Sequence, residues 1–165
     1  MIDRREKGKR LLSYYTNLPL NKPEMINFGL THFCNYRCSI CNTREDNPRR
    51  DEEIDVNVLK KTIAEIGEWG DIGVSFAGGE PLIRKKDLLE SLREAQKHDL
   101  TTYVTTNASK IDKETASSLI EAEVDFISLS LEATDKEVND SIRNTGSYED
   151  VLRAINVFKD LKNKR

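Results

Sequence analysis

Three cysteines carry the clearest chemical signal in the sequence. Cys34, Cys38 and Cys41 follow the spacing C-x3-C-x2-C, and the chain has no other cysteine. A disulfide framework usually has an even number of cysteines, spread along the chain to close loops. Clustered thiolates are instead typical ligands of iron–sulfur clusters and zinc. The spacing therefore predicts a metal or cluster site.

The number of thiols predicts an open metal position. A four-iron cluster is ordinarily held by four cysteines, and this chain offers three. One iron would be open or bound by another group, and open positions are where metal sites do chemistry. The alternative is a Cys3His zinc site that includes His32. Structural zinc sites usually bring their ligands in two separated pairs, which disfavours this alternative.

Further polar or glycine-containing groups follow the other predicted strands. Paired glycines allow the backbone to approach a ligand closely. In parallel α/β sheets, ligands bind beyond the carboxyl ends of the strands. The cysteines and these groups are therefore expected to share one rim of the sheet. The groups are Gly78-Gly79-Glu80-Pro81, Thr106-Asn107, and Ser130 with Glu132.

The elements that must position these residues alternate between strand and helix. The predicted strands are 26–31, 72–77, 100–106 and 125–131. Helices are predicted after Asp55, over 87–98, 112–123 and 136–143, and from a capping box of Ser147 and Asp150. Four strand–helix units in a row indicate an α/β fold with a parallel sheet and right-handed crossovers.

Composition and the ends of the chain narrow the function classes. The net charge of −3 indicates neither a nucleic-acid nor a membrane partner. The chain has no apolar run of the roughly 20 residues that a spanning helix needs. Residues 1–24 read as an N-terminal helical extension without a secretory signal, so we expect a cytoplasmic protein.

The motifs together resemble the radical S-adenosylmethionine (radical SAM) superfamily. The resemblance covers about residues 25–162 and is carried by CNYRCSIC, GGEPL and TTN. SLSLEA and DSIRNTGSYEDVLRAI resemble the group with molybdenum-cofactor-biosynthesis and peptide-modifying members. The resemblance implies that residues 25–165 form an incomplete core domain, a partial parallel (β/α) barrel with four of six units. A truncated chain or a partner chain that completes the barrel is then expected.

The resemblance also implies roles for individual residues. Cys34, Cys38 and Cys41 would bind three irons of a 4Fe–4S cluster, and S-adenosyl-L-methionine would chelate the fourth. The remaining positions would contact that cofactor. The backbone around Gly78, Gly79 and Glu80 would meet the methionyl amino group. Asn107, Ser130 and Glu132 would lie near the ribose or methionyl part, and Arg143 would pair with the carboxylate. Ile40 stands where the family often has an adenine-positioning aromatic residue, and Tyr36 supplies a ring in the same loop.

The implied activity is that of a radical SAM enzyme. The reduced cluster would cleave S-adenosylmethionine to a 5′-deoxyadenosyl radical, which abstracts hydrogen from an unidentified small molecule or peptide. A flavodoxin- or ferredoxin-type protein would supply the electron. Two alternatives remain open: a non-catalytic iron–sulfur or zinc-binding module, and an inactive fragment of a larger radical SAM enzyme.

Overall fold

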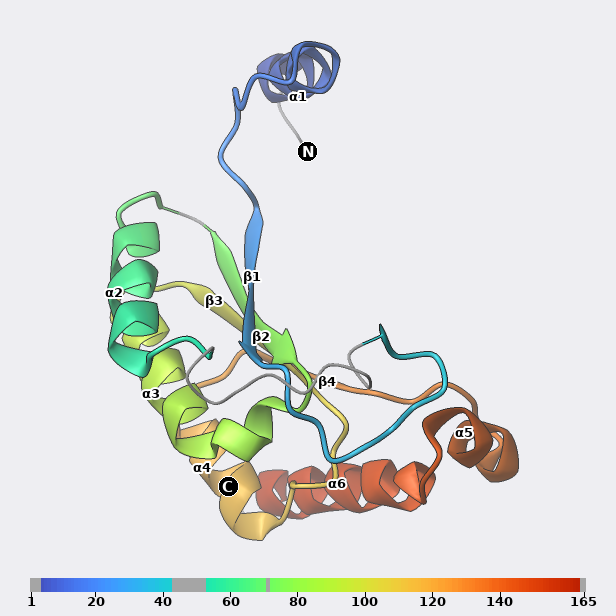
Figure 1. Ribbon diagram of the computed structural model, residues 1–165. Coiled ribbons are helices and arrows are strands. Elements are labelled where there is room, and N and C mark those ends of the chain that lie inside the picture. The colour runs from blue at the N-terminus through green and yellow to red at the C-terminus, as the bar shows by residue number, and fades with distance from the viewer. Residues whose placement is uncertain (1–3, 43–52, 71, 164–165) are drawn as a thin grey trace.

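A computed structural model describes residues 4–42, 53–70 and 72–163. Its centre is a sheet of four parallel strands in the order β1-β2-β3-β4 (Figure 1). The strands are β1 Met25–Thr31, β2 Gly73–Gly78, β3 Thr101–Thr106 and β4 Phe126–Leu129. The helices are α1 Arg4–Thr16, α2 Val56–Gly67, η3 Pro81–Arg84, α3 Lys85–Gln96, α4 Lys113–Glu121, α5 Lys136–Arg143 and α6 Ser147–Lys162. The predicted succession of strands and helices is confirmed.

The strand register separates the two faces of the sheet. Phe76 pairs with Phe28 on one side and Val104 on the other, so these side chains share a face. That face is packed against the helices and is the hydrophobic core, with Phe76 and Val104 fully buried. On the opposite face, the side chains toward the carboxyl ends of the strands are small or polar, and Asn27 and Thr105 are exposed. The same face carries Met25 and the stacked rings of Tyr103 and Phe126 nearer the amino ends. The two faces therefore have different environments, one dry and one open.

Helices α2 and α3 cover the core face because each has one apolar side. Helix α2 buries Leu59, Ile63 and Ile66 at helical spacing. Its predicted start is confirmed, because the Asp55 carboxylate accepts hydrogen bonds from Asn57 N at 2.8 Å and from Val58 N at 3.3 Å. Within the described part of the chain, no helix combines the length and apolarity needed to cross a membrane.

The predicted capping box of α6 is wrong. The residue that caps α6 is Gly146, and it makes no side-chain cap bond. Ser147 Oγ instead accepts a hydrogen bond at 2.8 Å from the fully buried Asn139. The backbone N–H of Tyr148, in the first turn of α6, donates to the Asp140 carboxylate at 2.9 Å, and this bond lowers the pKa of Asp140. The Ser147 hydroxyl is therefore engaged by Asn139 and does not cap α6. Asp140 of α5 accepts the hydrogen bond at the start of α6 in its place.

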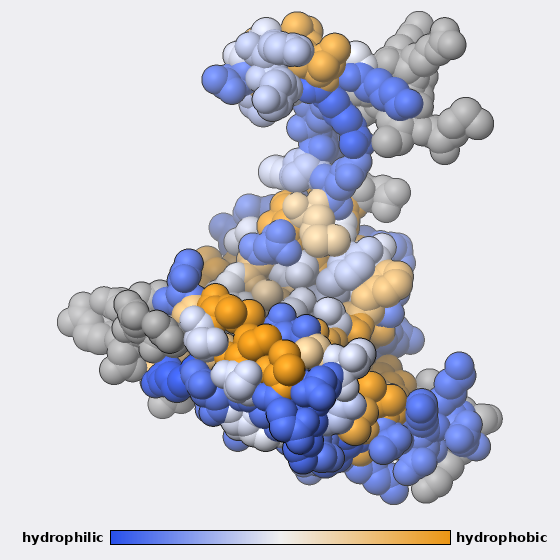
Figure 2. Space-filling view, turned by 90° about the vertical axis from the view of Figure 1, so that its right-hand side faces the viewer, coloured by the Kyte–Doolittle hydropathy of each residue, from blue (hydrophilic) through white to orange (hydrophobic). Residues whose placement is uncertain are grey.

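Helix α1 stands away from the sheet, joined to β1 by residues 17–24 (Figure 1). The face of α1 seen in Figure 2 is largely hydrophilic with an apolar patch. Leu11, Tyr14 and Tyr15 are all more than half exposed. Arg10 pairs with Glu24, which fastens the helix to its own linker. The site described next is therefore built without α1.

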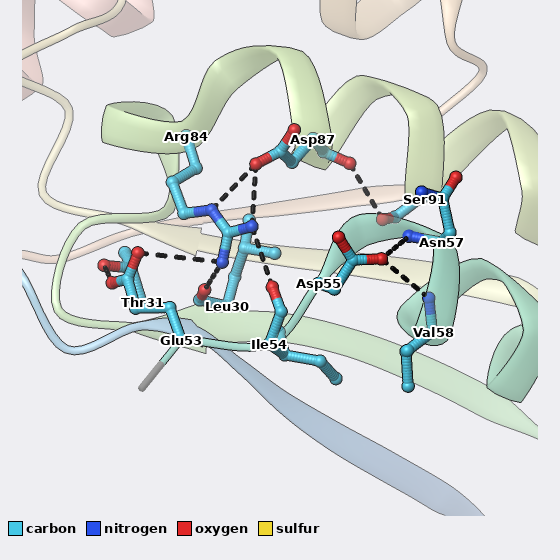
Figure 3. Close-up of polar contacts among 10 residues, drawn as sticks. All are labelled: Leu30, Thr31, Glu53, Ile54, Asp55, Asn57, Val58, Arg84, Asp87 and Ser91. Atoms are coloured by element: carbon cyan, nitrogen blue, oxygen red, sulfur yellow. Dashed lines mark hydrogen bonds and ion pairs between the residues drawn. The ribbon is translucent and has the colours of Figure 1, made fainter. Parts of the chain in front are cut away.

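Arg84 joins the two ends of the long loop between β1 and α2 (Figure 3). Its guanidinium donates to Leu30 O at 2.8 Å, to Ile54 O at 2.9 Å and to the Asp87 carboxylate at 2.8 Å. Glu53 lies 3.8 Å from the same guanidinium. Leu30 lies at the end of β1 and Ile54 lies two residues before α2 begins, so Arg84 closes the base of the loop that carries the cysteines.

Replacing Arg84 should destabilise the fold markedly. Arg84→Met leaves two carbonyls and a carboxylate without their donor, and we expect a loss of about 3 kcal/mol of unfolding free energy. Guanidinium chloride denaturation measures it. The matched control is Lys85→Met, because the ion pair that Lys85 forms among the described residues is with the exposed Glu114, and such pairs contribute about 0–1 kcal/mol. Equal losses in both variants would contradict the assignment.

Candidate functional site

A cavity of about 280 Å³ lies beyond the carboxyl ends of the strands. Ten of the twelve predicted site residues line it, all except Glu80 and Glu132. The lining residues are Cys34, Tyr36, Cys38, Ile40, Cys41, Ala77, Gly78, Gly79, Thr105, Thr106, Asn107, Ser130 and Arg143. Ala77 and Thr105 were not predicted. Their positions on the open face near the strand ends, readable from the period-two pattern, were the signal that could have found them.

The cysteine loop between β1 and the undescribed residues 43–52 is fastened to α5. Ser39 donates from both its amide and its hydroxyl to Ile142 O, at 2.8 and 2.9 Å. Asn144 Nδ2 donates to Arg37 O at 2.7 Å. These contacts span more than 100 residues of sequence, so the thiols are positioned by the C-terminal end of α5 as well as by β1.

The three thiols share the same degree of burial. Cys34, Cys38 and Cys41 are all of intermediate exposure. Burial raises the pKa of the Cys38 thiol, while the positive charge of Arg143 opposes that shift. Arg143 therefore favours the thiolate, which is the form that binds metal.

Gly78 and Gly79 are required by the approach of the cysteine loop. A Cβ on Gly78 would lie 2.3 Å from Thr31 O, and one on Gly79 would lie 2.1 Å from Phe33 O. Gly78 also has a φ of +124°, which side chains rarely adopt. The Gly79 amide donates to Thr31 O at 2.6 Å and the Glu80 amide to Phe33 O at 2.8 Å. The backbone amides of Gly79 and Glu80 are thus bonded within the chain.

Glu80 joins the ends of β2 and β3 and does not line the cavity. Its side chain is fully buried and accepts hydrogen bonds from Leu82 N at 3.0 Å, Thr106 Oγ1 at 2.7 Å and Asn107 N at 2.8 Å. Burial raises the pKa of this carboxyl, and the three hydrogen bonds act in the opposite direction. The structure therefore places Glu80 behind the cavity wall, where it positions Asn107.

Arg143 lines the cavity and has one side-chain donor that no protein group uses. Its side chain is 9% exposed, and Nη2 donates to Glu132 Oε1 at 2.7 Å. Its Nε is buried and has no hydrogen-bond partner. Leaving a buried donor unsatisfied costs about 1–3 kcal/mol, so such a donor calls for an explanation. Glu132 orients the guanidinium and lies outside the cavity lining.

The two residues predicted near the adenine lie in different environments. Tyr36 is 7% exposed, and its hydroxyl donates to the Asp150 carboxylate at the start of α6. Burial and Asp150 raise the pKa of Tyr36 well above its ordinary value. Ile40 is 63% exposed on the rim of the cavity. Tyr36 therefore anchors the loop, while Ile40 leaves an apolar surface open.

Asn107 and Ser130 lie where β3 and β4 end. Asn107 Nδ2 donates to Asn35 Oδ1 at 3.0 Å and lies 3.7 Å from Cys34 Sγ. The Ser130 amide donates to Thr106 O at 3.0 Å, which continues the pairing of the two strands up to the cavity. Both residues line the cavity.

The fold and this site define a class of β/α proteins that carry a triple-cysteine loop directly after the first strand of a parallel sheet. Comparison with known proteins names the family: the Radical SAM superfamily matches residues 29–165. The chain belongs to the radical SAM superfamily.

Curated relatives share 28–31% identity. Fe-coproporphyrin III synthase of Methanosarcina barkeri is 28% identical over 149 residues, which cover 90% of this chain and 37% of that protein. GTP 3′,8-cyclase of Chlorobaculum tepidum is 31% identical over 134 residues, which cover 80% and 40%. The chain thus spans about two fifths or less of the relatives it matches.

A solved structure confirms the predicted fold class. Streptococcus suis SuiB bound to S-adenosylmethionine matches with a TM-score of 0.70 and 22% identity. The match covers 93% of this chain and 35% of that one. The four parallel strands are therefore part of a radical SAM-type (β/α) barrel.

Proposed function

We propose that the cavity binds a 4Fe–4S cluster through Cys34, Cys38 and Cys41 and S-adenosylmethionine beside it. The observation that carries the proposal is Arg143, which lines the cavity together with the three thiols and whose buried Nε has no hydrogen-bond partner. A carboxylate is the acceptor that best fits a free guanidinium donor. S-adenosylmethionine carries one, so the donor set fits this cofactor.

The arrangement of the thiols supports a cluster over a single zinc ion. The cysteines line a cavity of about 280 Å³ together with Arg143 and the strand ends. A polynuclear cluster needs its ligands spread around it, whereas a tetrahedral zinc draws them to one point.

The chain's own residues would bind the cluster and S-adenosylmethionine and orient them. When bound, the cluster and S-adenosylmethionine would together supply a 5′-deoxyadenosyl radical by one-electron reductive cleavage. Arg143, held by Glu132, would take the carboxylate of the cofactor. Gly78 and Gly79 keep the cavity wall thin enough for the cysteine loop to close against β2, and Ile40 offers an apolar contact for the adenine.

Substrate and partners follow from the same proposal. The open face of the sheet, with Asn27, Thr105 and Ser128 exposed, would form the floor for a small-molecule or peptide substrate. A flavodoxin- or ferredoxin-type reductant would supply the electron. Strand β4 ends the strand order. We propose that further β/α units, in the same or a partner chain, continue the barrel of the 25–165 domain there.

Anaerobic reconstitution tests this function. The chain is loaded with iron and sulfide, reduced with dithionite, and mixed with S-adenosylmethionine. We expect about four irons per chain, a change in the electron paramagnetic resonance signal on adding the cofactor, and formation of 5′-deoxyadenosine. One equivalent of zinc and no charge-transfer absorption would favour a zinc module. A filled cluster that binds the cofactor without forming 5′-deoxyadenosine would favour an inactive fragment.

A further inference from the structure

The sulfur of Cys34 receives two N–H groups from the protein. Asn107 Nδ2 donates to Cys34 Sγ at 3.7 Å, and the backbone amide of Tyr36 donates to it at 3.4 Å. The Tyr36 amide belongs to the cysteine loop itself, two residues further on. Asn107 comes from the end of β3, 73 residues away, so this side chain is a tertiary contact to one predicted cluster ligand.

The amide of Asn107 is fixed in the orientation that points N–H at sulfur. Its Oδ1 accepts from Ser109 N at 3.0 Å and from Ser109 Oγ at 2.6 Å. Its backbone amide is bonded to the buried Glu80 carboxylate, and the residue is 5% exposed. Because both Ser109 donors require the oxygen on their side, Nδ2 faces Cys34 and Asn35.

A donor fixed against a ligating sulfur changes the energetics of an iron–sulfur cluster. Reduction adds negative charge that is shared with the thiolate sulfurs, and an N–H dipole aimed at sulfur stabilises it. Hydrogen bonds to sulfur are among the features that set cluster reduction potentials. The 5% exposure of Asn107 strengthens the effect, since water screens a buried dipole less.

We propose that Asn107 tunes the cluster through Cys34, raising its reduction potential and so easing its reduction by a protein electron donor. This inference rests on the proposed cluster site. Asn107 acts through the sulfur of a ligand, and its predicted contact with the ribose or methionyl part of the cofactor is not needed for this effect.

The test is an anaerobic redox titration of the reconstituted chain, followed by electron paramagnetic resonance. Asn107→Ala removes the N–H···S bond, and we expect its midpoint potential to be lower than that of the wild type. Asn35→Ala is the matched control. It removes the Asn107–Asn35 and Asn35–Ser109 contacts at 3.0 and 2.8 Å but leaves the sulfur donor in place. Its midpoint potential should match that of the wild type.

The outcomes separate this inference from the proposed function. An unchanged potential in Asn107→Ala, or an equal fall in Asn35→Ala, overturns the tuning assignment while the cluster stands. A wild-type chain that takes up no cluster overturns both. If Asn107→Ala does not load, Asn107→Asp is titrated, since it keeps an oxygen for Ser109 and lacks the donor. Failure of both variants to load would show that Asn107 builds the loop and would refute tuning.

Discussion

Cys38→Ala is expected to abolish assembly of the four-iron cluster. The chain has three cysteines and therefore no spare thiol to replace a missing ligand. With two thiolates left, iron content after reconstitution should fall from about four per chain to below one, and absorption near the sulfur-to-iron charge-transfer bands should disappear. Formation of 5′-deoxyadenosine should fall below detection. Iron and sulfide analysis with absorption spectroscopy measures the change.

Ser39→Ala is the matched control for this loss. It changes the neighbouring residue and removes one of the two hydrogen bonds to Ile142 O, while the Ser39 amide keeps the other at 2.8 Å. The loop should stay fastened and the cluster should load. If Cys38→Ala retained a full complement of iron and sulfide, Cys38 could not be a ligand, and the cluster assignment for this loop would fail.

The sequence was most informative where local pattern and chemistry coincide. Apolar residues repeat about every second residue in strands and every three to four residues in helices, so the two kinds of element could be told apart along the chain. Their alternation predicted the parallel sheet. Asp55 was predicted as a helix cap from its neighbours alone, and its carboxylate makes that bond. The cysteines and Asn107 were predicted to share one rim from their places after strands, whereas Arg143 was predicted only through the family resemblance. The structure brings all of them to one cavity.

Contacts between distant segments were not predictable in the same way. The Tyr36–Asp150 bond, the Arg84 clamp and the bond of Ser147 to Asn139 all depend on how elements pack in three dimensions. Ser147 matched a local capping pattern, but its hydroxyl accepts a hydrogen bond from the buried side-chain amide of Asn139. The free Nε of Arg143 is likewise a property of packing, because the residue type says nothing about which donors are already used.

Arg143→Met should weaken binding of S-adenosylmethionine while the cluster remains. Its Nε is the one buried side-chain donor without a partner in the described part of the chain, and hydrogen bonds to charged groups contribute about 1.5–3 kcal/mol. That range corresponds to a dissociation constant about 10- to 100-fold higher. Titration of the reduced cluster with S-adenosylmethionine, followed by electron paramagnetic resonance, measures it, and iron content checks that the cluster is loaded.

Two further variants distinguish direct binding from a structural effect. Arg143→Lys keeps the charge near Cys38 but cannot donate from Nε while pairing with Glu132, so its affinity should fall between wild type and Arg143→Met. Glu132→Gln keeps an acceptor for Nη2 at 2.7 Å and leaves Nε in place, so its affinity should change least. If Arg143→Met and Glu132→Gln weakened binding equally, the effect would come from loss of their pair. Arg143 would then hold α5 in place without contacting the cofactor.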